Sequence, residues 1–270
     1  MRQIPNIFTL INLVFGCIAI ILILQTGESI VNLDQAGAIY LNFPEKIGQG
    51  ALFIFAAAIV DFFDGFFARM LKANSEKGKQ LDSLCDVVSF GVAPGMILFQ
   101  LLRMGYAQSN DGMDVPVLAL LPAFIFSMAV AWRLAKFNIS TNQTYSFRGV
   151  PSPAAGLLIA SFPLIIWYSN YFNIQTLFIN TWFLYFVIIA CSYLMVSNHS
   201  FMAMKFTDLS IKNNLLKYVL VVLSIIAIIA LQWLAVPVIF VLYVIFSLMS
   251  KEPPPMVADM GQETTLDVTV

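Results

Sequence analysis

Charged residues are scarce in this chain. Only 11% of its 270 residues are Asp, Glu, Lys or Arg, whereas 60% are hydrophobic, and the mean hydropathy is +0.85. A soluble globular domain carries about 25% charged and about 45–50% apolar residues. A chain with so little charge cannot cover a water-facing surface. The composition therefore excludes an ordinary soluble domain and favours a lipid bilayer as the solvent.

Cysteine and histidine are also scarce. The three cysteines, Cys17, Cys85 and Cys191, lie in apolar stretches without the spacing of a disulfide framework, so we expect no structural disulfides. The one histidine, His199, falls in a predicted loop, and we expect it to be solvated rather than catalytic. The sequence shows no internal repeat and no separate soluble domain. Its net charge of −1 indicates no particular partner, and we expect no nucleic acid to bind.

Apolar runs long enough to cross a bilayer recur along the chain. A membrane helix needs about 20 predominantly apolar residues, so the runs predict an all-α membrane bundle of about eight helices. These are expected at 6–25, 48–71, 79–102, 115–137, 152–171, 176–196, 214–233 and 236–250. The first run is longer than a signal-peptide core and lacks a small-residue cleavage site, so we expect it to be retained. Pro237 offers a break in the last long run, after Trp233.

Lysine and arginine are distributed unevenly about these helices. In an eight-span arrangement, all of them except Lys46 and Arg103 fall on the side of the two termini. Basic residues concentrate on the cytoplasmic side of membrane proteins, so both termini are predicted to be cytoplasmic. A seven-span arrangement would place Lys251 on the opposite side and fits less well. We expect one membrane-embedded domain over 1–250 and a flexible cytoplasmic tail over 251–270, which is polar and proline-rich.

Four aspartates lie inside the second and third apolar runs. Asp61 and Asp64 are three residues apart and Asp82 and Asp86 are four apart, so each pair shares one face of a helix. The connection between the two helices is short, so the helices are expected to be antiparallel neighbours whose pairs face each other. Placing four carboxylates in a membrane costs of order 10 kcal/mol. Packing alone gives no reason to accept that cost.

A site for divalent cations explains these aspartates. Carboxylate oxygens suit hard ions such as Mg²⁺ or Mn²⁺, and two such ions would neutralise the cluster and prepare it to hold phosphate oxygens. Gly65 and Gly78 remove side chains near the acidic face, and Arg69 could pair with a phosphate. From spacing alone, an enzyme and an ion-coupled transporter remain open alternatives. The paired broken helices in two repeated halves that mark many transporters are not evident.

The acidic segment resembles the signature of the CDP-alcohol phosphotransferase family. Every fixed position is present in the pattern Asp61-x2-Asp64-Gly65-x2-Ala68-Arg69-x8-Gly78-x3-Asp82-x3-Asp86. Further segments are similar to the phosphatidylserine synthase branch of that family: IPNIFTLINL near the N-terminus, SFGVAPG after Asp86, and RLAKFN followed by FRGVPSPAAG over 133–156. The resemblance covers residues 4–156, more than half of the chain.

The resemblance implies that a phosphatidyl group passes from CDP-diacylglycerol to L-serine, giving phosphatidylserine and CMP. Four aspartates, Asp61, Asp64, Asp82 and Asp86, would bind Mg²⁺ or Mn²⁺, as two ions, and Asp86 would also act as the general base. The residues that it implies for binding the CDP-lipid are Asn6, Thr9, Gly65, Ala68, Arg69, Ser75 and Gly78. It further implies a homodimer in the cytoplasmic (inner) membrane, multi-pass, with the active site facing the cytoplasm.

The acceptor brings a carboxylate and an ammonium, and Arg133 or Arg148 could bind the carboxylate. The alternative is that these arginines only anchor the chain at the cytoplasmic interface. Asn138 and Ser152 could add neutral polar contacts, although Ser152 is equally suited to cap a helix. Glycerol 3-phosphate or inositol phosphate is the alternative acceptor. Such an anionic phosphate would need several converging cations, and the candidates here are few.

Overall fold

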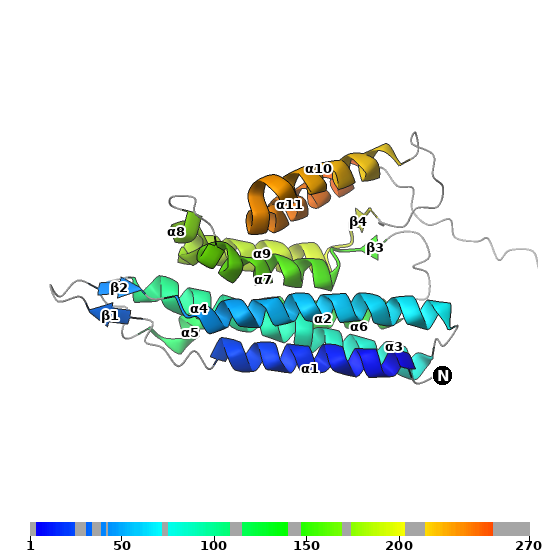
Figure 1. The fold of residues 1–270 in the computed structure, drawn as a ribbon, viewed down its shortest axis with the longest axis horizontal. Helices are drawn as coiled ribbons and strands as arrows, with labels where there is room; N and C mark the ends of the chain where they lie inside the picture. Colours follow the sequence, from blue (N-terminus) through cyan, green and yellow to red (C-terminus); the bar gives the residue numbers. More distant parts are fainter. Residues whose placement is uncertain are drawn as a thin grey trace, which may run out of the picture.

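The fold is a long bundle of helices that lie roughly along one axis (Figure 1). It is seen in a computed structural model that describes residues 4–24, 31–33, 39–41, 43–71, 75–108, 115–139, 147–168, 174–202 and 214–250. Within these ranges the chain is almost entirely helical, apart from two short pairs of antiparallel strands. The predicted all-α class is confirmed.

The elements follow one another along the chain with few interruptions. The first part contains α1 (Ile4–Leu24), α2 (Glu45–Met70), α3 (Glu76–Asp86), the π-helical segment η1 (Val87–Val92), α4 (Ala93–Ala107), α5 (Val117–Leu120) and α6 (Ala123–Ile139). The second part contains α7 (Ser152–Tyr168), α8 (Ile174–Ile179), α9 (Thr181–Val196), α10 (Leu215–Leu231), the 3-10 turn η2 (Gln232–Leu234) and α11 (Ala235–Met249). Strand β1 (Val31–Leu33) pairs with β2 (Ile39–Leu41), and β3 (Phe147–Arg148) pairs with β4 (Ser200–Phe201).

The outside of the bundle is apolar. Among the described residues, four stretches of helix are long and apolar enough to cross a membrane: Asn6–Leu24, Glu45–Phe67, Glu76–Ala107 and Leu215–Met249. Large apolar side chains such as Leu118, Trp182 and Ile229 are exposed on the surface. Soluble proteins rarely expose so much contiguous apolar surface, whereas helices in contact with lipid do. The structure therefore supports a helical membrane protein.

Helix boundaries differ from the predicted ones in three places. The third helix runs without a break over Glu76–Ala107, which at 1.5 Å per residue is about 48 Å and exceeds the hydrocarbon core of a bilayer. The predicted helix 176–196 is divided at Asn180, whose side chain accepts a bond from the Phe183 N–H and caps α9. The predicted helix 115–137 is divided at Leu121 and Pro122, between α5 and α6. The last long run divides at η2, where Gln232 has a φ of +51°, which agrees with the predicted break after Trp233. There α10 and α11 fold against each other as a hairpin.

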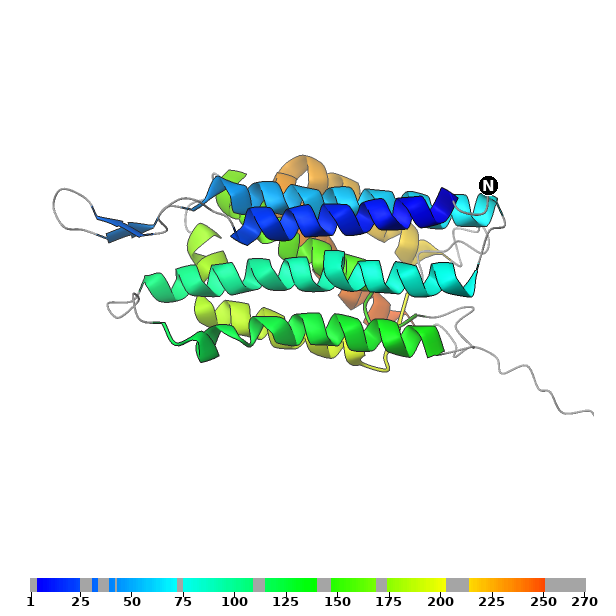
Figure 2. The ribbon, with the colours of Figure 1, turned by 90° about the horizontal axis from the view of Figure 1, so that it is seen from below.

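One end of the bundle collects the aspartates. Helix α1 begins, α2 ends and α3 begins at this end, as Figures 1 and 2 both show. Helices α1 and α2 are extensively packed against each other, and α3 and η1 pack against α1. The last turns of α2 and the first turns of α3 therefore lie at the same level and run antiparallel, each packed against α1.

Segment η1 holds the middle of the bundle together directly after Asp86. The Gly91 carbonyl accepts a bond from Ser127 Oγ at 2.8 Å, and Ser89 Oγ donates to the Asn12 carbonyl at 3.1 Å. A Cβ atom added at Gly16 would lie 3.0 Å from Ser89 Cα, and one added at Gly156 would lie 3.1 Å from Phe90 Cα. Helices α1 and α7 thus approach the backbone of η1 closely. π-Helical turns are often found at functional sites, and this one fixes the position of Asp86.

Candidate active site

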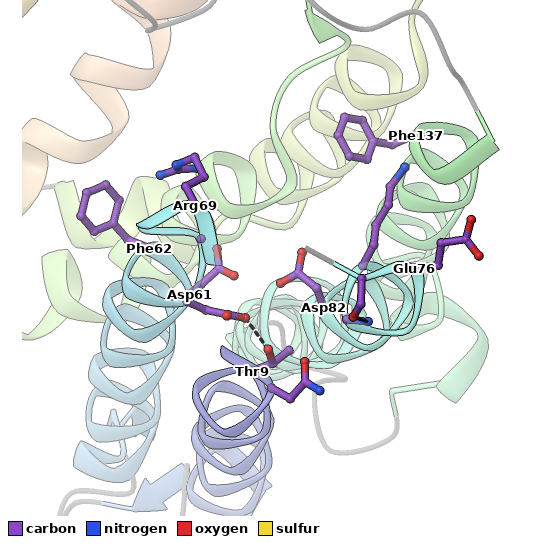
Figure 3. A pocket seen from close by; sticks show the side chains of 13 residues that line it. Thr9, Asp61, Phe62, Arg69, Glu76, Asp82 and Phe137 are labelled. Carbon is purple, nitrogen blue, oxygen red and sulfur yellow. Dashed lines mark hydrogen bonds between the residues drawn. The ribbon is translucent and has the colours of Figure 1, made fainter. Parts of the chain in front are cut away.

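A cavity of about 760 Å³ opens at the end of the bundle where α1 begins. We call it the outer cavity, and Figure 3 shows its lining side chains, which come from four helices. They are Asn6 and Thr9 from α1, Asp61, Phe62, Asp64, Gly65 and Arg69 from α2, Ser75, Glu76, Gly78, Lys79 and Asp82 from the start of α3, and Phe137 from α6. Ligand pockets have typical volumes of roughly 300–1,000 Å³, so the outer cavity has the size of a small-molecule site.

The aspartates meet at this cavity. Asp61 and Asp82 project toward each other from α2 and α3 (Figure 3). Together with Asp86 they offer three carboxylate oxygens that all lie within 4.8 Å of one another. Asp64 is buried beside them, and its carboxylate accepts a hydrogen bond from the Thr9 hydroxyl. Helices α2 and α3 thus bring the two pairs of aspartates together.

This donor set fits a hard divalent cation. Three carboxylates at such short separations repel one another, and a buried charge without compensation is costly. Mg²⁺ and Mn²⁺ prefer carboxylate oxygens, which is the only kind of donor that Asp61, Asp82 and Asp86 supply. These three residues, with Asp64 beside them, could therefore hold a divalent ion between α2 and α3.

Most residues predicted to bind the CDP-lipid line the outer cavity. Asn6, Thr9, Gly65, Arg69, Ser75 and Gly78 all do so. Ala68 lies on α2 in the same segment, but its side chain is outside what the structure describes.

Local geometry explains three of these small residues. Ser75 caps α3, because its Oγ accepts a bond from the Gly78 N–H at 3.0 Å. A Cβ atom at Gly78 would lie 3.0 Å from Ser75 Oγ and 3.2 Å from Asn6 Oδ1, so a larger residue would press on both. A Cβ atom at Gly65 would meet Arg69 Nη1 only at 3.6 Å, which leaves space in front of that turn.

A second group of polar side chains lies deeper in the bundle, around Asp86. This inner cluster consists of Asn12, Asp86, Arg133 and Ser152. Asn12 Nδ2 donates to Asp86 Oδ1 at 3.3 Å, and Arg133 Nη1 donates to Ser152 Oγ at 3.1 Å. Arg133 and Asp86 attract each other electrostatically. Asn12 and Ser152 are 0% exposed, Asp86 is 6% exposed and Arg133 is 8% exposed, so water has little access to the cluster.

The inner cluster contains two of the four residues predicted to bind the acceptor. Ser152 begins α7, and its hydroxyl reaches Arg133 across the helix interface. Asn138 lies further along α6 and donates instead to Ser83 Oγ at 2.9 Å, while its carbonyl accepts a bond from Lys79 Nζ at 3.4 Å. The backbone of Arg148 lies in β3, but its side chain is outside the described part of the chain.

One feature of the site was missed by the sequence analysis. Asn12 was not singled out, although it follows Thr9 by three residues and therefore lies on the same face of α1. As a basic residue at this end of the chain's helices, Lys79 could set the topology or attract a nucleotide diphosphate, and it lines the outer cavity, with its Nζ 5.3 Å from the centre of the Phe137 ring. His199 is exposed, as expected.

Comparison with known proteins gives a consistent result. A family sequence profile described as CDP-alcohol phosphatidyltransferase matches residues 2–189, which contain the whole outer cavity and inner cluster. The CDP-diacylglycerol–serine O-phosphatidyltransferase of Helicobacter pylori is 34% identical over 227 residues, covering 81% of this chain and 89% of that protein. The protein of the same name from Bacillus subtilis is 39% identical over 127 residues, covering 46% and 67%. The archaetidylserine synthase of Methanothermobacter thermautotrophicus is 29% identical over 135 residues, covering 49% and 54%.

Proposed function

Because the chain belongs to the CDP-alcohol phosphatidyltransferase family, we propose that it transfers the phosphatidyl group of CDP-diacylglycerol to the hydroxyl of L-serine and releases CMP. Family membership makes the chain a transferase of phospholipid synthesis, and the names of its relatives supply the proposed pair of substrates. The observation that carries the proposal is the meeting of Asp61, Asp82 and Asp86 beside a cavity large enough for a nucleotide diphosphate.

The lipid substrate would occupy the outer cavity. Arg69 and Lys79 line it and supply positive charge for the diphosphate. Asn6, Thr9, Ser75 and the backbone at Gly78 would contact the nucleotide side. Phe62 also lines the cavity and is 65% exposed, so it forms an apolar edge next to the surrounding lipid. The acyl chains would leave the cavity there and enter the bilayer.

Asp86 is suited to take the proton from the acceptor. In the proposed reaction the serine hydroxyl oxygen attacks the phosphorus that carries diacylglycerol, its proton passes to Asp86, and the bond from that phosphorus to the bridging oxygen breaks to release CMP. Two divalent ions, Mg²⁺ or Mn²⁺, held by the four aspartates would stabilise the negative charge of the diphosphate and of the departing phosphate. Asn12 and Arg133 keep Asp86 in place through a hydrogen bond and a charge attraction.

Arg133 is the acceptor-binding cation that the structure favours. It is buried next to Asp86, it is held by Ser152, and its Nε atom has no hydrogen-bond partner within the described residues. A carboxylate offers the acceptor that Nε lacks. Arg148 and Asn138 remain candidates on the sequence pattern alone.

We also propose that the chain crosses the cytoplasmic (inner) membrane eight times as one domain over 1–250, with both termini and the site on the cytoplasmic side. The distribution of basic residues supports this orientation, and Arg69, Lys79 and Lys136 lie toward the end of the bundle that carries the outer cavity. Serine is a water-soluble acceptor that this orientation would make available. The family resemblance alone supports a homodimer, and the tail over 251–270 lies outside the described residues.

The proposal is tested by measuring CMP release from purified protein in detergent. CDP-diacylglycerol and Mg²⁺ or Mn²⁺ would be supplied with L-serine, glycerol 3-phosphate, inositol phosphate or no acceptor. We expect release to require serine and metal, to disappear in Asp86→Asn and to persist in Glu45→Gln, an exposed carboxylate at the opposite end of α2. Release with another acceptor would overturn the serine assignment. Folded protein that releases no CMP with any acceptor would favour the ion-coupled transporter.

A further inference from the structure

Two buried hydrogen-bonding atoms of the inner cluster have no partner among the described residues. They are Asn12 Oδ1 and Arg133 Nε. Buried polar atoms are almost always hydrogen-bonded, because an unpaired one keeps the full cost of losing its water. One of these atoms can only accept a hydrogen bond and the other can only donate one. The inner cluster therefore lacks a donor for Asn12 Oδ1 and an acceptor for Arg133 Nε.

The orientation of the Asn12 amide is set by its neighbours. Asn12 turns its Nδ2 group toward Asp86 and donates to Oδ1 at 3.3 Å, which is the orientation that a carboxylate requires when it acts as a metal ligand or a base. The backbone of Asn12 is fixed as well, because its carbonyl accepts a bond from Ser89 Oγ at 3.1 Å. Rotating the amide by half a turn would place Asn12 Oδ1 against Asp86 Oδ1, and two oxygens that both lack a hydrogen repel each other. Asn12 Oδ1 is thus held away from Asp86 and needs a donor from elsewhere.

The missing partners match the two ends of an amino acid. An ammonium group carries only donors and a carboxylate carries only acceptors. A hydroxy amino acid would offer its hydroxyl to Asp86, its carboxylate to Arg133 and its ammonium to Asn12. All three protein groups belong to the inner cluster, where water is nearly absent and hydrogen bonds discriminate strongly between ligands.

We infer that Asn12 recognises the ammonium group of the acceptor, through a hydrogen bond to its Oδ1 atom. The inference rests on the proposed function and deepens it, since it assigns the part of the acceptor that Arg133 leaves unbound. It also supplies a reason for rejecting glycerol 3-phosphate and inositol phosphate, because neither carries an ammonium to pair with Asn12.

The test compares acceptors that lack one group at a time. L-Serine, 3-hydroxypropionate (which has no ammonium) and ethanolamine (which has no carboxylate) would be supplied with CDP-diacylglycerol and Mg²⁺, and kcat/KM would be obtained from CMP release. Asn12→Leu should lower kcat/KM for serine and for ethanolamine roughly 10- to 100-fold relative to 3-hydroxypropionate, because the two amines lose a charge-assisted bond and 3-hydroxypropionate has none to lose. Arg133→Gln should instead lower serine and 3-hydroxypropionate together relative to ethanolamine.

Ser89→Ala is the matched control. It removes the bond to the Asn12 backbone and loosens the same contact between α1 and η1, but it leaves the amide side chain intact. We expect it to change all three acceptors by the same factor. If Asn12→Leu is not stable in detergent, Asn12→Ser makes the same comparison, since its shorter side chain cannot reach both Asp86 and an ammonium.

A binding measurement separates recognition from catalysis. Alanine and propionate would be used as inhibitors against serine, because they differ by the ammonium and neither can react. Asn12→Leu should weaken inhibition by alanine and leave propionate unchanged. Equal losses with every acceptor, or a changed metal requirement with an unchanged serine preference, would overturn the inference and reduce Asn12 to a residue that positions Asp86 or a metal. If serine did not increase CMP release by the wild-type protein, the proposed function itself would be refuted, which is a separate outcome.

Discussion

The outer cavity and the inner cluster are built in different ways. The outer cavity is open, and nearly all of its lining residues come from α1 and from the α2–α3 segment over 61–82. The inner cluster is almost closed to water, and its four members come from α1, α3, α6 and α7. On the proposed function, recognition of the lipid substrate would depend on a short stretch of sequence. Recognition of the acceptor would depend on the packing of helices that are far apart in the chain.

This difference assigns different energetic roles to the two regions. Charged groups such as Arg69 and Lys79 remain partly hydrated in the outer cavity, so each contributes modestly and a mismatch is tolerated. In the inner cluster an unpaired atom keeps its full desolvation cost until a ligand satisfies it. We therefore expect the outer cavity to determine affinity for the CDP-lipid and the inner cluster to determine which alcohol reacts.

Removing divalent metal should have the largest effect, because the carboxylates proposed to hold it belong to both regions. Asp61 and Asp82 line the outer cavity and Asp86 belongs to the inner cluster. We expect excess EDTA to abolish CMP release and added Mg²⁺ or Mn²⁺ to restore it, with Mg²⁺-saturated EDTA as the control. Metal should also raise the thermal unfolding temperature, since a bound ion stabilises the folded state. Full activity in excess chelator would contradict the assignment of the aspartates.

The second largest effect should come from the inner carboxylate. Asp86→Asn should lower kcat by roughly 10²- to 10⁴-fold, which is the usual contribution of a general base. Binding of CDP-diacylglycerol should weaken less than tenfold, because Asp86 does not line the outer cavity. Both quantities can be measured on one preparation, by CMP release and by lipid-dependent thermal stabilisation. Loss of CDP-lipid binding as large as the loss of kcat would remove the distinction between the two regions.

The same distinction explains what the sequence could predict. The spacing of Asp61, Asp64, Asp82 and Asp86 was enough to place both pairs on facing helices, because helical periodicity and a short connection decide that geometry. The apolar runs predicted the helices themselves. The predicted break after Trp233 falls within the turn η2 that separates α10 from α11.

The sequence pattern did not predict the contacts between helices that are distant in the chain. Arg133 and Ser152 were each considered as acceptor-binding residues, but nothing in their spacing showed that they pair with each other. Asn12 was missed because its role depends on Asp86 and Ser89, which are more than seventy residues away. Long-range packing within helices of similar apolar composition carries no local signal. The proposed acceptor site could therefore be identified only from the structure.

A matched pair of arginine variants would test whether the outer cavity and the inner cluster bind different substrates. Arg69→Gln should raise KM for CDP-diacylglycerol, and Arg133→Gln should raise KM for serine, each by roughly 10- to 100-fold for the loss of one charge-assisted hydrogen bond. Each variant should leave the KM for the other substrate within about threefold. Thermal unfolding of both variants would control for the burial of Arg133. If either variant raised KM equally for both substrates, the two regions would not bind different substrates.

The smallest expected effect concerns the support of the inner cluster. Ser127→Ala removes the bond between α6 and the Gly91 carbonyl of η1, which should cost about 0.5–1.5 kcal/mol of stability and lower the unfolding temperature by roughly 1–6 °C. Ser224→Ala is a suitable control, because its hydroxyl bonds only to the Leu220 carbonyl within α10. Ser127→Ala should raise KM for serine and leave KM for CDP-diacylglycerol unchanged, since η1 follows Asp86 and contributes no residue to the lining of the outer cavity. An equal change in both constants, or an equal loss of stability in Ser224→Ala, would show that η1 supports the bundle as a whole.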